Sequence, residues 1–181
     1  MNRTEAIQLI DKHIANKNLK KHLLATEACM KKLAEHFGED TEQWSITGLV
    51  HDIDYEMTKD DPSLHGELGG EMLTKYQLPP DSITAIKLHG KSSVPPGLLA
   101  NCLYAVDPLT GLIVAAALMH PEKKLASLDL KFIQNRFKEK RFAAGANREQ
   151  IQSIQNTGLD LDDFIELALS AMTEIADDLG L

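Results

Sequence analysis

The chain has 181 residues, 43% of them hydrophobic and 25% charged, which is enough for one well-buried core and typical of an ordinary globular protein. Its formal net charge of −8 argues against non-specific binding to nucleic acid or anionic membranes, because no surplus of basic residues is available to neutralise phosphates. No uninterrupted apolar run approaches the ~20 residues of a membrane span and the N-terminus lacks an apolar leader, so we expect a cytoplasmic protein without a nucleic-acid or membrane partner.

Hydrophobic periodicity predicts an all-α fold, because no run alternates apolar and polar residues as a strand would. Asn18 is expected to cap the second helix. The pair Pro79-Pro80 is expected to separate two later helices, and Asp81 or Ser82 to cap the second of these two. The predicted helices are, in chain order, 2–16, 18–37, 41–50, one that begins after Pro62 and carries His65, 82–89, 98–119, 127–141, 147–157 and 160–179. Cys29 and Cys102 fall in apolar helical patterns, so we expect buried free thiols.

The third predicted helix ends with a histidine directly followed by an aspartate, His51 and Asp52. A neutral nitrogen donor beside an anionic oxygen donor suits a divalent transition metal such as iron, manganese or zinc. Neighbouring side chains on a helix point about 100° apart, so both reach one ion most readily at a helix end, where the chain can turn.

A single acidic residue, Asp107, lies inside the apolar helix 98–119, directly before Pro108. Proline removes a backbone donor and frees the carbonyl one turn back, so we expect a kink there. Burial of an unpaired carboxylate is very costly, so Asp107 requires a partner.

Periodicity places a set of polar residues on inward faces or at helix ends, and apart from one adjacent pair each comes from a different helix. This is the layout of a metal site built in a helical core from facing side chains. Four imidazoles and two carboxylates are too many for one tetrahedral ion and suit two ions, with Asp52 as the bridge because it can use both oxygens. We therefore expect two divalent transition-metal ions, iron or manganese, with zinc, nickel, cobalt or magnesium as alternatives. The six residues are His22, His51, Asp52, His65, His89 and Asp107.

This ordered H…HD…H…H…D set resembles the HD-domain superfamily of metal-dependent phosphohydrolases. The two extra histidines, in Leu64-His65-Gly66 and Ile86-Lys87-Leu88-His89-Gly90, resemble the two-metal branches, which include the HD-GYP cyclic-dinucleotide phosphodiesterases and the dinucleoside-polyphosphate hydrolases. The resemblance implies a single-domain HD-type helical bundle over residues 1–181, with a metal-binding core at 18–120 and a C-terminal helical extension at 121–181. It implies that one ion is held by His22, His51, Asp52 and Asp107, and that His65 and His89 join Asp52 on the second.

The resemblance also implies the chemistry, which is cleavage of a phosphoester or phosphoanhydride bond by a metal-activated water. The expected substrate is a small phosphorylated molecule, nucleotide-like in character. Two alternatives stay open, namely a di-iron oxygenase with the same ligands and a non-catalytic signalling or binding module with the same fold. Six retained ligands argue against the last, because an empty site would leave several buried polar groups unsatisfied.

One departure concerns the residues that follow the His-Asp pair. Many superfamily members continue with Gly-Lys, whereas this chain continues with residues 53–56, Ile-Asp-Tyr-Glu, and the Gly-Tyr-Pro signature is absent too. The lysine that could meet a substrate phosphate is therefore missing, and Lys91 and Arg148, both in predicted loops, are the candidate substrate-binding cations. Asp52 and Asp54 are the candidate catalytic residues, with Asp54 as a general base or, alternatively, a solvated loop acid.

Overall fold

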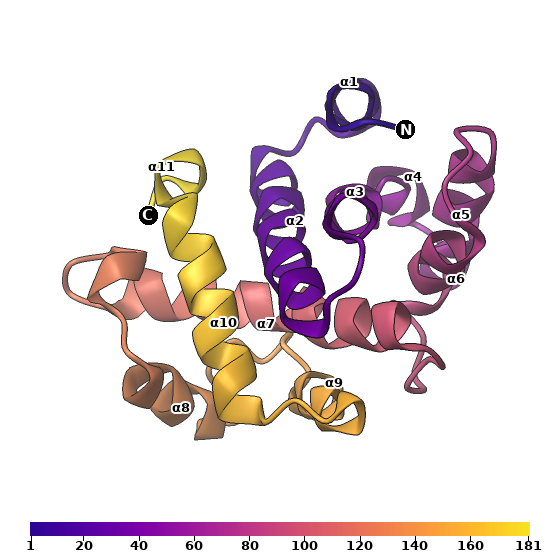
Figure 1. Ribbon diagram of the computed structural model, residues 1–181. Helices are drawn as coiled ribbons and strands as arrows, with labels where there is room; N and C mark the ends of the chain where they lie inside the picture. The colour runs from indigo at the N-terminus through magenta and orange to yellow at the C-terminus, as the bar shows by residue number, and fades with distance from the viewer.

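The computed structural model describes residues 1–181 as an all-α fold without strands, which confirms the predicted fold class (Figure 1). Its helices and 3-10 turns are, in order, α1 (Arg3–His13), α2 (Lys17–Phe37), α3 (Thr41–Val50), α4 (Tyr55–Thr58), η1 (Pro62–Leu64), α5 (Glu67–Thr74), α6 (Pro80–Leu88), α7 (Leu98–Met119), η2 (Leu125–Ser127), α8 (Leu130–Lys138), α9 (Arg148–Gln152), η3 (Ser153–Thr157), α10 (Leu161–Glu174) and α11 (Ala176–Leu179).

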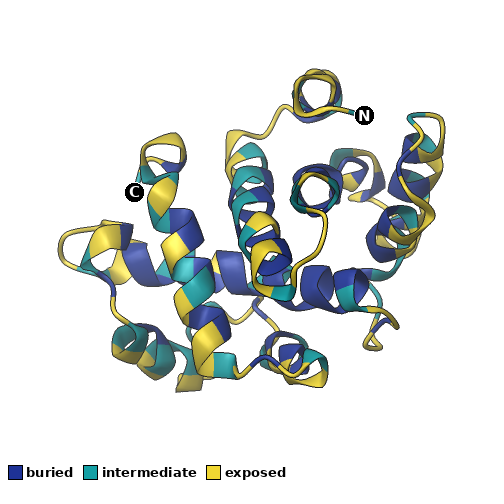
Figure 2. Cartoon of the chain, viewed as in Figure 1, coloured by how far each residue is buried: buried dark blue, intermediate teal, exposed yellow.

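The two longest helices, α2 and α7, cross near the middle of the molecule (Figure 1). Helices α3 to α6 lie on one side of α2, and α10 and α11 lie on the other. One cluster of 43 buried hydrophobic residues runs through both sides, and the buried faces of the helices point toward this shared interior (Figure 2). The free thiols of Cys29 and Cys102 lie in this core, as predicted, and burial raises the pKa of Cys102 to about 12.

Helix α7 is the most apolar element of the chain. By length and composition it is the one helix that could cross a membrane, with a mean hydropathy of 1.8 over 18 residues, although no uninterrupted apolar run within it approaches the ~20 residues of a membrane span. However, 61% of that window is buried inside the protein, and the core helix of a soluble protein passes the same test. The apolar character of α7 is therefore weak support for a membrane segment, and it is used here to pack α2, α6 and α9.

Pro108 lies inside α7, which continues through it. Because proline has no N–H, the carbonyl of Tyr104 one turn earlier loses its helical donor. The side chain of Gln150 in α9 replaces it, since its Nε2 donates to the Tyr104 oxygen at 2.8 Å and lies 3.4 Å from the oxygen of His89. The proline thus creates a binding point for the C-terminal segment beside Asp107 and His89.

Several predicted helix boundaries were wrong in the first half of the chain. Asn16, not Asn18, caps α2, because its side chain accepts hydrogen bonds from the first free N–H groups. Helix α5 begins at Glu67, so His65 precedes it instead of lying on its face. Pro80 is the first residue of α6, a position where the missing N–H costs nothing.

In the second half the differences are smaller. The segment predicted as a helix over 127–141 is helical only over Leu130–Lys138, because Asp129 supplies the cap by accepting from the Phe132 N–H. The two predicted C-terminal helices are each divided, into α9 with η3 and α10 with α11.

Close packing of α2 on α3 gives a stability prediction for Gly48. A Cβ at Gly48 would lie 2.9 Å from both the Met30 Cγ and the Thr26 carbonyl oxygen, whereas a Cβ at Gly111 in α7 meets nothing within 4 Å. We expect Gly48→Ala to lower the free energy of unfolding by about 1–3 kcal/mol, because backbone cannot yield to the clash. The control Gly111→Ala should raise it by about 0.5–1 kcal/mol through helix propensity. Urea unfolding measures both, and equal stabilities would contradict the packing argument.

Candidate metal centre

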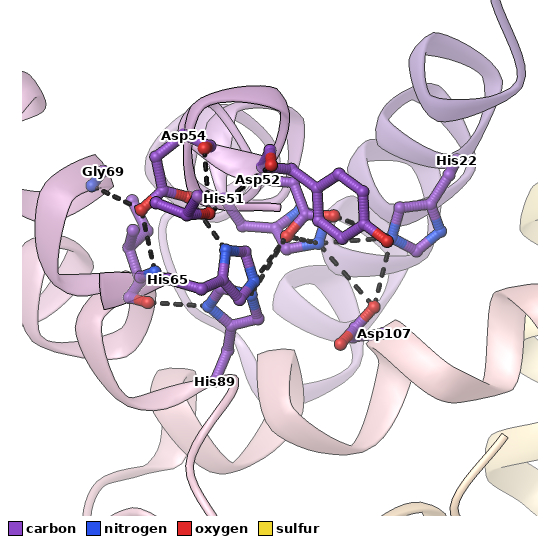
Figure 3. Close-up of polar contacts among 12 residues, drawn as sticks. His22, His51, Asp52, Asp54, His65, Gly69, His89 and Asp107 are labelled. Carbon is purple, nitrogen blue, oxygen red and sulfur yellow. Dashed lines mark hydrogen bonds and ion pairs between the residues drawn. The ribbon is translucent and has the colours of Figure 1, made fainter. Parts of the chain in front are cut away.

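The structure brings all six predicted ligand residues to one place, where α2, α3, α6 and α7 approach one another (Figure 3). Three of them, His51, Asp52 and His89, are buried, with at most 6% of their surface exposed. The side chains of His22, His65 and Asp107 are 19–27% exposed and form the open edge of the cluster. A small molecule therefore reaches the cluster past these three residues.

The first group of donor atoms is formed by His22, His51 and Asp107. The His22 Nε2 lies 3.1 Å from the Asp107 Oδ1 and 3.2 Å from the His51 Nε2, and the His51 Nε2 lies 3.8 Å from the same Asp107 oxygen. One nitrogen or oxygen atom from each residue thus faces a common point, as a metal ion requires.

The second group is formed by His65 and His89 around Asp52. Their Nε2 atoms lie 3.0 Å apart, and they lie 3.2 and 3.1 Å from the Asp52 Oδ1, respectively. Asp52 also reaches the first group, since its Oδ1 lies 3.5 Å from the His51 Nε2 and its Oδ2 lies 3.8 Å from the His22 Nε2. Asp52 is therefore the residue that lies between the two groups.

The orientation of the two buried imidazoles follows from backbone carbonyls at the ends of their own helices. The His51 Nδ1 lies 2.8 Å from the Gly48 oxygen, and the His89 Nδ1 lies 2.6 Å from the Ile86 oxygen. A carbonyl oxygen can only accept, so Nδ1 carries a proton in both rings, and Nε2 presents a lone pair when the ring is neutral.

Side chains orient the other two imidazoles in the same sense. The His65 Nδ1 lies 2.9 Å from the Asp54 Oδ1, and the His22 Nδ1 lies 3.0 Å from the Thr110 Oγ1. Because the Thr110 hydroxyl donates its proton to the Asp107 carbonyl, it accepts from His22. All four histidines therefore direct Nε2 at the centre of the cluster, where it presents a lone pair when the ring is neutral.

Converging acceptors define what the cluster can bind. Four Nε2 atoms and two carboxylates meet at 3.0–3.8 Å, and when the rings are neutral these acceptors repel one another unless a cation, a proton or a metal ion, lies among them. Imidazole nitrogen and carboxylate oxygen are donors that iron, manganese and zinc accept. The residues present therefore fit divalent transition metals.

The pKa values show the same demand for positive charge. Burial by itself would raise the pKa of Asp52, but the charge of His51 and the hydrogen bonds with His65 and His89 hold it well below its usual range. Burial would lower the pKa of His65, but its hydrogen bonds with Asp52 and Asp54 raise that pKa to about 10. Because protons occupy the places where a metal binds, metal binding is expected to release them.

Asp54 lies behind His65 and has no exposed surface, so the interpretation as a solvated loop acid is wrong. Its Oδ1 accepts from the His65 Nδ1, and its Oδ2 accepts from the N–H groups of Gly66 and Gly69 at 2.8 and 2.7 Å. Both oxygens are thus engaged with the protein, at the beginning of α5. A Cβ at Gly69 would lie 3.1 Å from the Asp54 Cγ, which explains the glycine at that position.

Glu56, the second acid after the His51-Asp52 pair, is also hydrogen-bonded to the backbone. The Glu56 Oε1 accepts from the N–H groups of Ala15 and Asn16, at 2.8 and 2.7 Å, and so fixes the connection between α1 and α2. Tyr55 between the two acids is 49% exposed, and its ring lies edge-on to His65 with 5.6 Å between the centroids. The residues that replace Gly-Lys therefore serve the scaffold around the cluster.

Arg148 does not have the position expected of a substrate-binding cation. Its guanidinium donates to backbone carbonyls of the segment 136–146, including those of Phe137, Ala143 and Ala146, and so holds the loop after α8. That prediction is corrected, because these carbonyls occupy the donors that a phosphate would need. Lys91 is half-buried two residues after His89, without an ion pair.

Thr110 was missed by the sequence reasoning, although it orients His22. A signal was present, since Thr110 follows Asp107 by three residues and so lies on the same face of α7. The carbonyls of Gly48 and Ile86 could not have been found in this way, because every residue has one.

The comparisons with known proteins agree with this geometry. The HD-domain family model matches residues 19–112, and the chain belongs to the HD-domain family. Ribonuclease Y of Bacillus subtilis is 30% identical over 135 residues, which is 73% of this chain and 26% of the relative. Ribonuclease Y 2 of Pediococcus pentosaceus is 31% identical over 94 residues, 52% of this chain and 18% of the relative. The chain thus spans at most about a quarter of these relatives. No solved structure matched it significantly.

Asp52 provides the first test of the metal centre. We expect Asp52→Ala to lose tight metal binding, because neither donor group is complete without the carboxylate that both share. Metal per chain is measured by inductively coupled plasma mass spectrometry after loading with Mn²⁺. The control is Asp60→Ala, an exposed acid outside the cluster, and full occupancy in Asp52→Ala would contradict a shared carboxylate.

Asp54 provides a second test. Asp54→Asn places an amide among three N–H donors, so we expect His65 to lose its fixed orientation and the second ion to bind about 10–100-fold more weakly. A Mn²⁺ titration followed by electron paramagnetic resonance resolves the two binding steps. Glu56→Gln is the matched control, because it makes the same chemical change two residues away without touching a candidate ligand. Identical titrations for all three proteins would show that Asp54 does not act through His65.

Proposed function

We propose that the chain is a metal-dependent phosphohydrolase that cleaves a phosphoester or phosphoanhydride bond. The observation that carries the proposal is the position of Asp52 between two groups of imidazoles whose Nε2 atoms all face inward. Membership of the HD-domain family and the similarity to proteins named ribonuclease Y support a hydrolase of this kind.

The residues of the cluster would form two metal sites that share Asp52. His22, His51 and Asp107 would hold one ion, His65 and His89 the other, and Asp52 would contact both. When bound, such ions supply positive charge to phosphoryl oxygens and lower the pKa of water. Thr110 and Asp54 keep His22 and His65 in the orientation that presents Nε2, so the donors do not have to rearrange when the site fills.

The charge around the cluster favours one type of phosphate bond. Arg148 is engaged with carbonyls, and the Gly-Lys lysine of many relatives is replaced by the buried Asp54 and by Tyr55. Of the two candidate cations only Lys91 stays without an engaged partner, so a dianionic monoester would depend mainly on the metal ions for neutralisation, whereas a diester or anhydride spreads its charge. The substrate proposed is therefore a nucleotide-like phosphodiester or phosphoanhydride.

The size of the substrate is a separate matter. The relatives are named ribonucleases, so the similarity does not support the exclusion of nucleic acid that the net charge suggested. A small nucleotide remains the proposal, and a short oligoribonucleotide is the competing substrate in the test below.

The type of bond is tested by steady-state rates on bis(p-nitrophenyl) phosphate and p-nitrophenyl phosphate with Mn²⁺ or Fe²⁺. We expect faster turnover of the diester, for the charge reason given above, and no turnover by Asp52→Ala. Faster cleavage of the monoester refutes the charge argument. A labelled oligoribonucleotide and a dinucleotide, compared at equal concentration, decide between RNA and a small substrate. No hydrolysis of any of them, together with oxygen uptake under reducing conditions, favours the di-iron oxygenase.

A further inference from the structure

A cavity of about 400 Å³ adjoins the candidate metal centre, between the first half of α2, the second half of α7 and residues 179–181 at the end of α11. His22 and Thr110, which are hydrogen-bonded to each other, form part of its wall. Since the Nε2 of the same His22 faces Asp107, the cavity and the cluster share one imidazole (Figure 3). A volume of 300–1,000 Å³ is common for small-molecule sites.

The charge of this cavity differs from that of four other cavities in the molecule. No aspartate or glutamate side chain lines it, although the chain carries 27 acidic residues, and each of four other cavities of 170–470 Å³ has at least one. Lys21 at its edge has no carboxylate partner and uses one donor on the Leu179 carbonyl, at 2.6 Å. An ammonium has three donors, so two remain for an anionic ligand.

The wall contributed by α7 leaves room for an apolar group. A Cβ at Gly111 would meet nothing within 4 Å, and the next turns present Val114 and Leu118, the latter 53% exposed. A glycine inside a helix costs about 0.5–1 kcal/mol relative to alanine, and an exposed leucine gains little from packing. Both features are expected where a ligand approaches the helix closely and covers its side chains.

We propose that this cavity binds the organic group of an anionic phosphoester whose phosphoryl group lies at the metal cluster. The inference rests on the proposed function and deepens it. The apolar wall takes a flat organic group of about the size of an aryl ring system or a nucleobase, and Lys21 selects for the anion. Because the cavity is bounded by residues 179–181 on one side, it suits a single such group, as in a small nucleotide or the terminal nucleotide of a chain.

The probe for this site is 1-naphthylphosphonate, whose C–P bond is not hydrolysed, so that binding is measured whether or not the protein is active. Calorimetry with the Mn²⁺-loaded protein is expected to give an affinity at least about tenfold higher than for inorganic phosphate or for 1-naphthol, the two halves of the probe. Gly111→Leu fills the open space and is expected to weaken binding of the probe about tenfold, which corresponds to about 1.4 kcal/mol of binding free energy. Gly145→Leu is the matched control, since its Cβ also meets nothing and the residue lies in a distant loop.

Lys21→Met tests the charge separately, and it should weaken binding of 1-naphthylphosphonate but not of 1-naphthol. If the Gly111→Leu protein no longer binds metal, a second variant, Leu118→Asp, is used in its place. Leu118 is exposed, so a carboxylate there repels the probe without disturbing the core.

Equal affinities for the probe and for phosphate, or no effect of filling the cavity, would overturn the proposal. Binding of the probe without hydrolysis of any substrate contradicts only the hydrolase function, and hydrolysis without preference for the naphthyl group contradicts only the cavity. Comparing the affinity for a mononucleotide with that for an oligonucleotide then shows whether the organic group belongs to a small nucleotide or to the terminal nucleotide of a chain.

Discussion

The structure depends on the convergence of six side chains, four imidazoles and two carboxylates, on one point that requires positive charge. His22, His51, His65 and His89 each use Nδ1 for a hydrogen bond directed away from that point, and Asp52 and Asp107 add negative charge to it. A positive charge must balance this arrangement, either as protons on the imidazoles or as metal ions. Because the six residues come from α2, α3, α6, α7 and the turn before α5, such a charge also joins the elements that carry them. Metal binding at these residues would therefore also stabilise the fold.

The same requirement explains residues that do not touch the cluster. Asp54 is buried to orient His65, and its other oxygen accepts the first N–H groups of α5, so that Gly69 must be small. Pro108, one residue after Asp107, frees the carbonyl that Gln150 binds. The C-terminal helices are in this way attached to the part of α7 that carries a candidate ligand, and they support the site although they contribute none of its donors.

The surroundings of the cluster suggest how specificity is divided. His51, Asp52 and His89 are buried, whereas His22 faces both the cluster and the neighbouring cavity. Recognition of a phosphate would then fall to the cluster and recognition of its organic group to α2 and α7. The ribonucleases Y that resemble this chain are about four times as long as the region they share with it.

The sequence alone determined the fold class and the set of candidate ligands. Helical periodicity is a local property, and so are the adjacency of His51 to Asp52 and the isolation of Asp107 in an apolar helix; each can be read within a few turns of chain. Helix boundaries were less accurate, because Asn16 and Pro80 compete with equally good neighbours for the terminal positions. The roles of Asp54, Glu56 and Arg148 were decided only by tertiary structure. Their partners are His65, the N–H groups of Ala15 and Asn16, and the carbonyls of the loop after α8, and no local pattern shows which distant backbone group a charged side chain will meet.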